Sequence, residues 1–486
     1  MENLKNIEPL LIWKYFNEIC SIPRLSKKED KIINYLVIFA QKKKLEFKKD
    51  KTGNLLILKN ASPGKENIRP VILQCHADMV GEKENKIKHD FDKDPIILNF
   101  RRNWVTASGT TLGADDGIGI ATLMALLEDK KCVHGPIECL FTVDEETGMT
   151  GAANLESGFI KSNILLNLDS EDEGQLFIGC AGGVDTIARF KIKTKSQKVK
   201  SKTYLIKLSG LKGGHSGDEI HKKHANAIML MNRFLWNASK EFRIDISRFE
   251  GGTLRNAIPR DAEALIMVPV EDIHKFESYF QIFVGIVRKE LEKTEPEHRF
   301  ILTESTPANS VLTKKLKKRL LNSLYSCPHG VIEWSKDFEG LVETSTNLAS
   351  IKFVDNKDIV ITTSQRSSVD SAKKDISDKV ASVFTLANAK IERTAGYPGW
   401  TPNLDSWILK ITIRSYKTLF RKKPLVKTVH AGLECGLILE KYPGMDMISF
   451  GPTIRGAHTT KERIDIKSTL KFWKLLNEVL KNIPES

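Results

Sequence analysis

The sequence lacks the features that would mark a membrane or secreted protein. No apolar run approaches the roughly 20 residues that a membrane-spanning helix needs. The opening stretch MENLKNIEPLLIWKYF contains acidic residues and lacks the basic start and the small-residue cleavage site of a signal peptide. We therefore expect a cytoplasmic protein with no membrane partner.

Cysteine pairs with a recognisable spacing are also missing. The seven cysteines are an odd number, and none of them forms a C-x-x-C motif. This pattern argues against a zinc knuckle or a redox pair. We expect free thiols, as is usual in a reducing compartment.

The net charge of +14 is not matched by any nucleic-acid-binding motif. The lysine-rich runs at 191–207 and 313–320 lack interleaved aromatic residues that would serve as stacking platforms for bases. Charge excess alone predicts solubility and non-specific attraction rather than a site. We expect no nucleic-acid partner.

The chain is long enough for more than one domain, and its texture changes twice. Its 486 residues exceed what one ordinary core accommodates. Residues 1–183 alternate strand-like and helix-like segments, which predicts an α/β domain with a mostly parallel sheet. Residues 184–397 have an α+β pattern, and residues 398–486 return to the first pattern after a Pro- and Gly-rich stretch. We therefore predict one α/β catalytic domain in two pieces, split by an inserted α+β domain.

Strands of the first region end in imidazole and carboxylate side chains. In open α/β sheets, ligands bind beyond the carboxyl ends of the strands, so these side chains should converge on one crevice. A loop before a predicted helix adds Asp115 and Asp116. The strand-end residues are His76, Asp78, Asp144, Glu145, Glu146 and Asp169.

Each of these motifs alone has an ordinary structural explanation. A strand-end histidine is often satisfied by its neighbours, a pair of aspartates often caps a helix, and an acidic triplet is often a solvated turn. Their joint placement favours a functional site. The carboxylates would repel one another unless a cation lay between them, and mixed imidazole and carboxylate ligands suit zinc, with manganese or cobalt as competitors. Glu145 and Glu146 point different ways on an extended backbone, which allows a metal ligand beside a general base.

Eight motifs spread in order along the chain together resemble one family. The sequence is similar to the dinuclear zinc peptidases of the aminoacylase and carboxypeptidase-G-like family, and most of all to their aminoacyl-histidine (cytosol non-specific) dipeptidase branch. The resemblance implies hydrolysis of dipeptides with free N-termini, including Xaa-His dipeptides. The motifs are HADMV, GADDGIG, DEETGMTGA, NLDSEDEG, GGHSG, RNAIPR, HAGLECG and GAHTTKE.

The resemblance implies a role for each residue at the metal centre. His76 and Asp169 would bind one zinc, Glu146 and His458 the other, and Asp115 would bridge the two. Asp78 would hold the His76 ring by a hydrogen bond. Glu145 would be the general base that takes a proton from the attacking water.

The resemblance also bears on the Asp115–Asp116 pair. The peptide bond after Asp115 is typically cis in this family. Asp116 stands where close relatives often have Asn, and we expect it to change little.

The resemblance also implies that the inserted domain is a lid that binds substrate and mediates a homodimer. His215 would help to hold the oxyanion, across a dimer interface in some relatives. Asn256 and Arg366 would bind the substrate's carboxylate, and Glu434 would receive its α-ammonium group. Aminotripeptidase activity, N-acyl amino acid amidohydrolase activity and a non-catalytic peptide-binding role remain open. The sequence does not specify the preferred dipeptide side chains.

Overall fold

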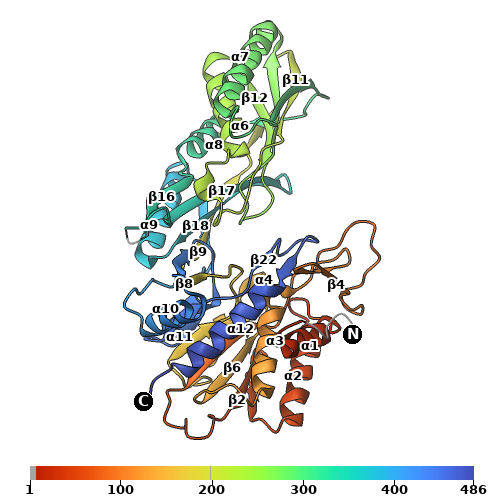
Figure 1. The fold of residues 1–486 in the computed structure, drawn as a ribbon. Helices are drawn as coiled ribbons and strands as arrows, with labels where there is room; N and C mark the ends of the chain where they lie inside the picture. The colour runs from red at the N-terminus through yellow and green to blue at the C-terminus, as the bar shows by residue number, and fades with distance from the viewer. Residues whose placement is uncertain (1–6, 197–198, 337, 486) are drawn as a thin grey trace. The chain divides into compact units, whose positions relative to one another are not determined.

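The computed structural model describes residues 7–196, 199–336 and 338–485. The chain divides into two compact units (Figure 1). The first consists of Met1–Cys180, Trp400–Thr428 and Leu433–Ser486, and the second of Ala181–Gly399 and Val429–Gly432. The second unit is therefore not one continuous insertion, because four residues rejoin it late in the chain.

The first unit is built on an eight-stranded mixed sheet with the order β1-β2-β6-β3-β7-β21-β8-β20. Its four central strands β6, β3, β7 and β21 run parallel, and the pairs β1–β2, β2–β6 and β21–β8 are antiparallel. The sheet strands are β1 (Phe47–Lys49), β2 (Leu55–Lys59), β3 (Val71–His76), β6 (Ile137–Thr142), β7 (Ile164–Asn167), β8 (Gln175–Cys180), β20 (Leu425–Val429) and β21 (Asp446–Ser449).

Helices cover this sheet, and a small second sheet lies beside it. Every residue of β3, β6 and β7 is buried, as expected for parallel strands covered on both faces. Figure 1 shows α3 lying beside α1, and α3 also packs on β3. The helices are α1 (Leu10–Cys20), α2 (Asp30–Lys42), α3 (Ala114–Glu128), α4 (Glu145–Gly148), α5 (Thr150–Ala153), α10 (Trp407–Phe420), α11 (Glu434–Lys441) and α12 (Ile466–Lys481). The small sheet contains β4 (Leu98–Arg101), β5 (Trp104–Ala107), β22 (Ile454–Arg455) and β23 (Arg463–Asp465).

The second unit is an antiparallel sheet with helices, which is the α+β pattern expected of the inserted region. Its strand order is β14-β11-β13-β12-β17-β18-β9-β19, with β16 paired to β17. The long strands are β9 (Gly182–Lys191), β11 (Ser201–Ser209), β12 (Asp245–Gly251), β13 (Ala262–Pro269), β17 (Val342–Val354) and β18 (Asp358–Ser367). The shorter strands of this sheet are β14 (Arg299–Glu304), β16 (Gly330–Trp334) and β19 (Lys390–Arg393). Strands β10 (Thr194–Lys195) and β15 (Val311–Leu312) form a separate two-stranded sheet.

Helices of the second unit gather at different parts of its sheet. Helix α6 packs on β11, β12 and β13, α7 packs on β13, and α9 lies against β9 and β18 (Figure 1). An aromatic cluster around Phe234 forms part of this core, with Phe276, Phe280 and Phe283 from α7 packed on it. The helices are α6 (Ala227–Glu241), α7 (Ile273–Leu291), α8 (Lys314–Ser326) and α9 (Asp370–Leu386).

Two expectations about composition can be checked on this structure. All seven cysteines are buried and none forms a disulfide, as the sequence predicts. Among the residues described, none of the helices combines the length and the hydrophobicity needed to cross a bilayer.

Candidate metal centre

Three neighbouring parallel strands deliver the predicted residues to one edge of the first unit's sheet. Strand β3 ends at His76, with Asp78 two residues later; β6 is followed by Glu145 and Glu146 at the start of α4; β7 is followed by Asp169. Because β6, β3 and β7 are adjacent and parallel, their carboxyl ends lie at the same edge. The sheet topology therefore accounts for the convergence that the strand endings predicted.

Asp115 lies between two histidines that are far apart in the sequence. Its Oδ1 is 3.0 Å from Nε2 of His76, and its Oδ2 is 3.1 Å from Nε2 of His458. The peptide bond from Asp115 to Asp116 is cis, as the family resemblance implies. One carboxylate thus offers one oxygen to each side of the cluster.

The other ligand candidates fall on the two sides of Asp115. His458 Nε2 is 2.9 Å from Oε2 of Glu146, and His76 Nε2 is 3.8 Å from Oδ1 of Asp169. The possible ligand atoms of Asp115, Glu146 and His458 all lie within 4.8 Å of one another, and so do those of His76, Glu145 and Glu146.

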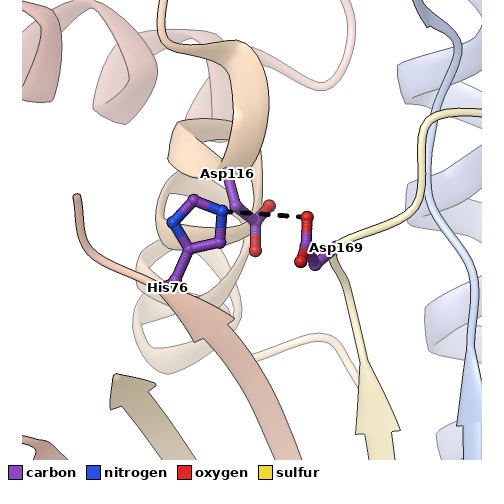
Figure 2. Close-up of side chains that lie close together, drawn as sticks. All are labelled: His76, Asp116 and Asp169. Carbon is purple, nitrogen blue, oxygen red and sulfur yellow. Dashed lines mark ion pairs between the residues drawn. The ribbon is translucent and has the colours of Figure 1, made fainter. Parts of the chain in front are cut away.

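Asp116 also reaches this cluster. Figure 2 shows its carboxylate beside the His76 ring and Asp169, and the possible ligand atoms of these three residues lie within 4.8 Å of one another. Its Oδ1 accepts the backbone N–H of Gly119 at 3.1 Å, while its Oδ2 is buried and has no hydrogen-bond partner among the described residues. The side chain is therefore close enough to affect the site, although its position in the sequence suggested little influence.

Asp78 connects the His76 ring to the start of α4. Its Oδ1 lies 3.3 Å from Nδ1 of His76 and accepts the backbone N–H of Glu145 at 3.0 Å. Its Oδ2 accepts the backbone N–H of Glu146 at 3.1 Å and the Ser26 hydroxyl at 2.8 Å. Burial alone would raise the pKa of Asp78, but its close contact with the His76 ring and the hydrogen bonds from Ser26 and Glu145 lower it to about 2. Asp78 is therefore an ionised group that orients the imidazole and the two glutamates.

The charges of the cluster are out of balance. Burial raises the pKa of Asp169, Glu145 and Glu146, and neighbouring carboxylates raise it further. The pKa of His458 is raised to about 11, chiefly by its hydrogen bonds to Asp115 and Glu146. The surrounding carboxylates therefore stabilise the protonated, positively charged imidazole. A divalent cation would supply the compensating positive charge directly.

The donor set fits divalent metal ions. Two imidazoles and several carboxylates converge, and oxygens Oε1 of Glu146 and Oδ2 of Asp116 are buried without a hydrogen-bond partner in the described part of the chain. Buried polar atoms without partners are costly unless a ligand satisfies them. Mixed nitrogen and oxygen ligands of this kind suit zinc and related transition metals.

Glu434 lies beneath the cluster rather than at its surface. The side chain is 0% exposed, and its Oε2 accepts hydrogen bonds from Gln74 Nε2 at 2.6 Å and from the Thr142 hydroxyl at 2.7 Å. Burial is the main cause that raises its pKa to about 7. Its Oε1 has no hydrogen-bond partner among the residues described. Contact with a substrate would require this oxygen to become accessible.

The remaining predicted residues lie in the second unit. The His215 ring is held at Nδ1, which accepts backbone N–H groups of Gly217 and Asp218 and lies 3.1 Å from Oδ2 of Asp218. Arg366 on β18 is buried and donates from Nη1 to the Tyr397 hydroxyl at 2.9 Å. The Asn256 side chain is exposed.

Asn256 and His215 belong to neighbouring loops. The carbonyl of Asn256 accepts the N–H of Ser216, and His215 pairs with Ala257 in an isolated bridge. Burial alone would raise the pKa of Asp218, but its close contact with the His215 ring and the charge of Arg366 lower it. The Ser345 hydroxyl lies 2.7 Å from Nε2 of His430, and Ser345 pairs with Arg366 across β17 and β18. His215, Arg366 and His430 therefore lie in one region of this unit.

Sequence reasoning missed two acidic residues close to the cluster. Glu462, in the motif that contains His458, is buried and binds the backbone that carries Asp115. Glu171 has a pKa raised to about 8 by burial and by the charge of Asp115. The motifs GAHTTKE and NLDSEDEG contain both residues, but nothing in either motif indicates where these side chains point.

Comparison with known proteins gives consistent matches over the whole chain. The model of peptidase family M20/M25/M40 matches residues 72–482. The cytosol non-specific dipeptidase of Escherichia coli (strain K12) is 41% identical over 484 residues, covering 100% of both chains. The crystal structure of aminoacylhistidine dipeptidase from Vibrio alginolyticus has a TM-score of 0.88 and 42% identity, covering 99% of this chain and 98% of that one. Aminopeptidase PepT from Bacillus cereus shares the fold, with a TM-score of 0.58 and 16% identity over 98% of this chain and 99% of that chain.

Proposed function

Because this chain belongs to peptidase family M20/M25/M40, we propose that it is a metal-dependent dipeptidase. Its substrates are dipeptides with free N-termini, including Xaa-His dipeptides, in keeping with the names of its full-length relatives in Escherichia coli and Vibrio alginolyticus. The observation that carries the proposal is the position of Asp115, with one carboxylate oxygen near each of His76 and His458.

Two divalent metal ions fit this arrangement, with zinc as the first candidate and cobalt or manganese as alternatives. His76 and Asp169 would hold one ion, Glu146 and His458 the other, and Asp115 would serve both. When bound, such ions supply Lewis acidity at the substrate carbonyl and at the attacking water. The surrounding residues then have to bind the peptide, orient it and move protons.

Glu145 is the proposed general base. Its backbone is fixed by Asp78, and burial and the neighbouring Glu146 raise the pKa of its carboxyl, which suits a group that accepts a proton and later gives it up. Glu145 would take a proton from the attacking water and return it to the leaving amine. Asp78 would keep the His76 ring in place during both steps.

The second unit would complete the site as a lid. We propose that the main segment of this unit, predicted as residues 184–397 between catalytic pieces 1–183 and 398–486, is an inserted domain that also mediates a homodimer; residues 429–432 join the same unit. His215 would offer Nε2 to the oxyanion because its Nδ1 is held by backbone N–H groups. Arg366 and Asn256 would bind the substrate's carboxylate, and Glu434 its α-ammonium group. We place the enzyme in the cytoplasm, as the name of its Escherichia coli relative suggests.

A substrate panel on purified protein tests the proposal. We expect hydrolysis of dipeptides, including Xaa-His, that is lost in a strong chelator and restored by zinc, cobalt or manganese. Tripeptides and N-acyl amino acids in the same panel distinguish the related activities. Full activity after confirmed metal removal, or no hydrolysis of any dipeptide with metal bound, would contradict it.

A further inference from the structure

A distant carboxylate fixes the backbone that carries Asp115. Glu462 is 2% exposed, and its carboxylate accepts hydrogen bonds from four consecutive backbone N–H groups at the entrance to α3. The donors are Leu112 (2.7 Å), Gly113 (2.9 Å), Ala114 (2.7 Å) and Asp115 (3.3 Å). Backbone N–H groups that converge in this way form a concave anion site, and here the anion is a side chain of the same protein.

The same segment is also held from its carbonyl side. The buried guanidinium of Arg24 donates from Nη2 to the carbonyl of Gly113, and from Nη1 to the carbonyls of Ala77 and Asp78 at 3.2 and 2.7 Å. Gly113 has a φ of 67°, and a Cβ there would come within 2.7 Å of the Arg24 side chain. The backbone conformation of residues 112–115 is thus fixed by two side chains: Glu462 accepts their N–H groups, and Arg24 donates to the carbonyl of Gly113.

Glu462 also belongs to the turn that carries His458. The N–H of Glu462 donates to the carbonyl of Thr459 at 3.1 Å, and the N–H of Thr459 donates to the carbonyl of Gly456 at 3.2 Å. His458 sits inside this turn with a φ of 60°. One residue therefore links the loop of His458 to the loop of Asp115, although the two loops are separated by more than 300 positions.

We propose that Glu462 is a positioning residue for the metal centre: its carboxylate binds the N–H groups of residues 112–115 and so sets the spacing between Asp115 and His458. The inference rests on the proposed function, because it assumes that these two residues bind metal. A carboxylate that only stabilised the start of α3 would affect folding but not metal affinity. Glu462 differs from such a cap because one of its four donors is the N–H of Asp115 itself.

Glu462→Gln tests the proposal, with Glu138→Gln as its matched control. Glutamine keeps the shape of the side chain but brings an NH2 group against backbone donors, so it cannot accept all four hydrogen bonds. Glu138 is a buried carboxylate of the same unit, and it accepts hydrogen bonds from the backbone N–H groups of Lys161 and Ser162. It lies at the start of β6, whereas α4 follows the other end of this strand. The metal-free proteins are titrated with zinc against a competing chelator, their cobalt absorption spectra are recorded, and their urea unfolding is measured.

We expect Glu462→Gln to weaken zinc binding about 10- to 100-fold, as is typical for partners that orient metal ligands, and to change the cobalt spectrum. Glu138→Gln should lower stability without either effect. Wild-type affinity and an unchanged spectrum in a folded Glu462→Gln protein would overturn the proposal.

If that variant does not fold, Glu462→Asp, which keeps the charge but is one methylene shorter, should bind zinc more weakly than wild type. Normal affinity in Glu462→Asp, or failure of both variants to fold at saturating zinc, would also overturn it. If the wild type itself binds no zinc, the metal centre fails together with this proposal.

Discussion

At the scale of single residues, the carboxylates of the cluster lie close together but differ in their surroundings. Asp115 is shared by two histidines, and Asp78 is ionised and holds a ring and two backbone N–H groups. The pKa of Glu145 is raised first by partial burial of its carboxyl and then by the negative charges of its neighbours. The same chemical group can be ligand, orienter or base because its surroundings set its pKa and its free lone pairs.

The role of Glu145 predicts a variant that binds metal but does not turn over. Glu145→Gln keeps the size of the side chain but cannot accept a proton, so turnover should fall about 10²- to 10⁴-fold, the usual contribution of a general base. Metal content by elemental analysis should remain that of the wild type. Loss of the metals together with the activity would instead make Glu145 a ligand.

Asp115 and its neighbour Asp116 provide a matched pair for the bridging role. Asp115→Asn removes the negative charge between the two histidines, so zinc affinity should fall about 100-fold or more, beyond the range found for residues that only orient ligands. Asp116→Asn should retain zinc, because the amide oxygen can still accept the N–H of Gly119. Competitive zinc titration of both variants checks this. Equal losses in the two would show that Asp116 shares the bridging task.

The low pKa of Asp78 predicts a dependence of stability on pH in the metal-free protein. Its pKa is about 2 in the folded state against an ordinary value of 3.8, so the folded state holds fewer protons in this range. The stabilisation is therefore complete above about pH 4 and is lost as the pH falls towards 2. At about 1.4 kcal/mol per pKa unit, it amounts to about 2 kcal/mol.

Urea unfolding of metal-free wild type and Asp78→Asn between pH 5 and pH 2 measures this contribution. The variant should lose about 2 kcal/mol less than the wild type over that interval, because it has no carboxylate to protonate at this position. Parallel curves for the two proteins would show that Asp78 titrates normally in the folded state.

At the scale of elements, the strand endings could be predicted from the sequence because a parallel sheet leaves little freedom. The apolar runs that became β3, β6 and β7 are short and uninterrupted, and their polar continuations had to meet at one edge. The α+β texture of the inserted region was likewise visible, since alternating strands and amphipathic helices have distinct periods. The fold class and the family are confirmed by the match to the peptidase family.

Contacts between backbone and distant side chains could not be predicted in the same way. Glu462 lies four residues after His458, but no periodicity shows that its carboxylate binds residues 112–115. Asp116 was expected to matter little because it follows Asp115, the residue predicted to bridge the metals. The turn at the start of α3 nevertheless brings its carboxylate beside His76 and Asp169. The return of residues 429–432 to the second unit had no compositional signal either.

A chain of buried polar side chains crosses the central strands beneath the metal centre. Gln74 on β3 donates to Glu434 and accepts from Asn167 on β7 at 2.6 Å, and Ser449 on β21 donates to Asn167 at 2.5 Å. Strands β3, β7 and β21 therefore each contribute a side chain that forms a hydrogen bond with a buried polar group of its neighbour. Removing a member leaves its neighbours unsatisfied in a buried environment.

Gln74→Leu should therefore destabilise the protein by about 1–3 kcal/mol, the cost of an unsatisfied buried polar group. Thr122→Val is the control, because the buried hydroxyl of Thr122 on α3 has no hydrogen-bond partner among the residues that the structure describes. That change should be neutral or stabilising. Urea unfolding of the metal-free proteins measures both changes in the free energy of unfolding. Equal destabilisation by the two substitutions would show that the hydrogen bonds of Gln74 add nothing to stability.

At the scale of the whole molecule, the predicted site residues are distributed over two compact units. The first unit contains all the metal-ligand candidates and Glu145, whereas the second contains His215, Asn256 and Arg366. If the second unit acts as a lid, its residues affect turnover without affecting metal binding. This separation makes the role of the second unit testable with single substitutions.

His215→Ala should reduce turnover about 10²- to 10³-fold, the usual contribution of one oxyanion donor, and should leave metal content and unfolding unchanged. Unchanged turnover would make the second unit a structural insert rather than a lid.

Mixing Glu145→Gln and His215→Ala subunits then shows which chain supplies the His215 ring. If the histidine acts across a dimer, hybrids contain a site with an intact base and an intact histidine, and activity returns. If it acts within its own chain, every site lacks one of the two groups and no mixing ratio restores activity.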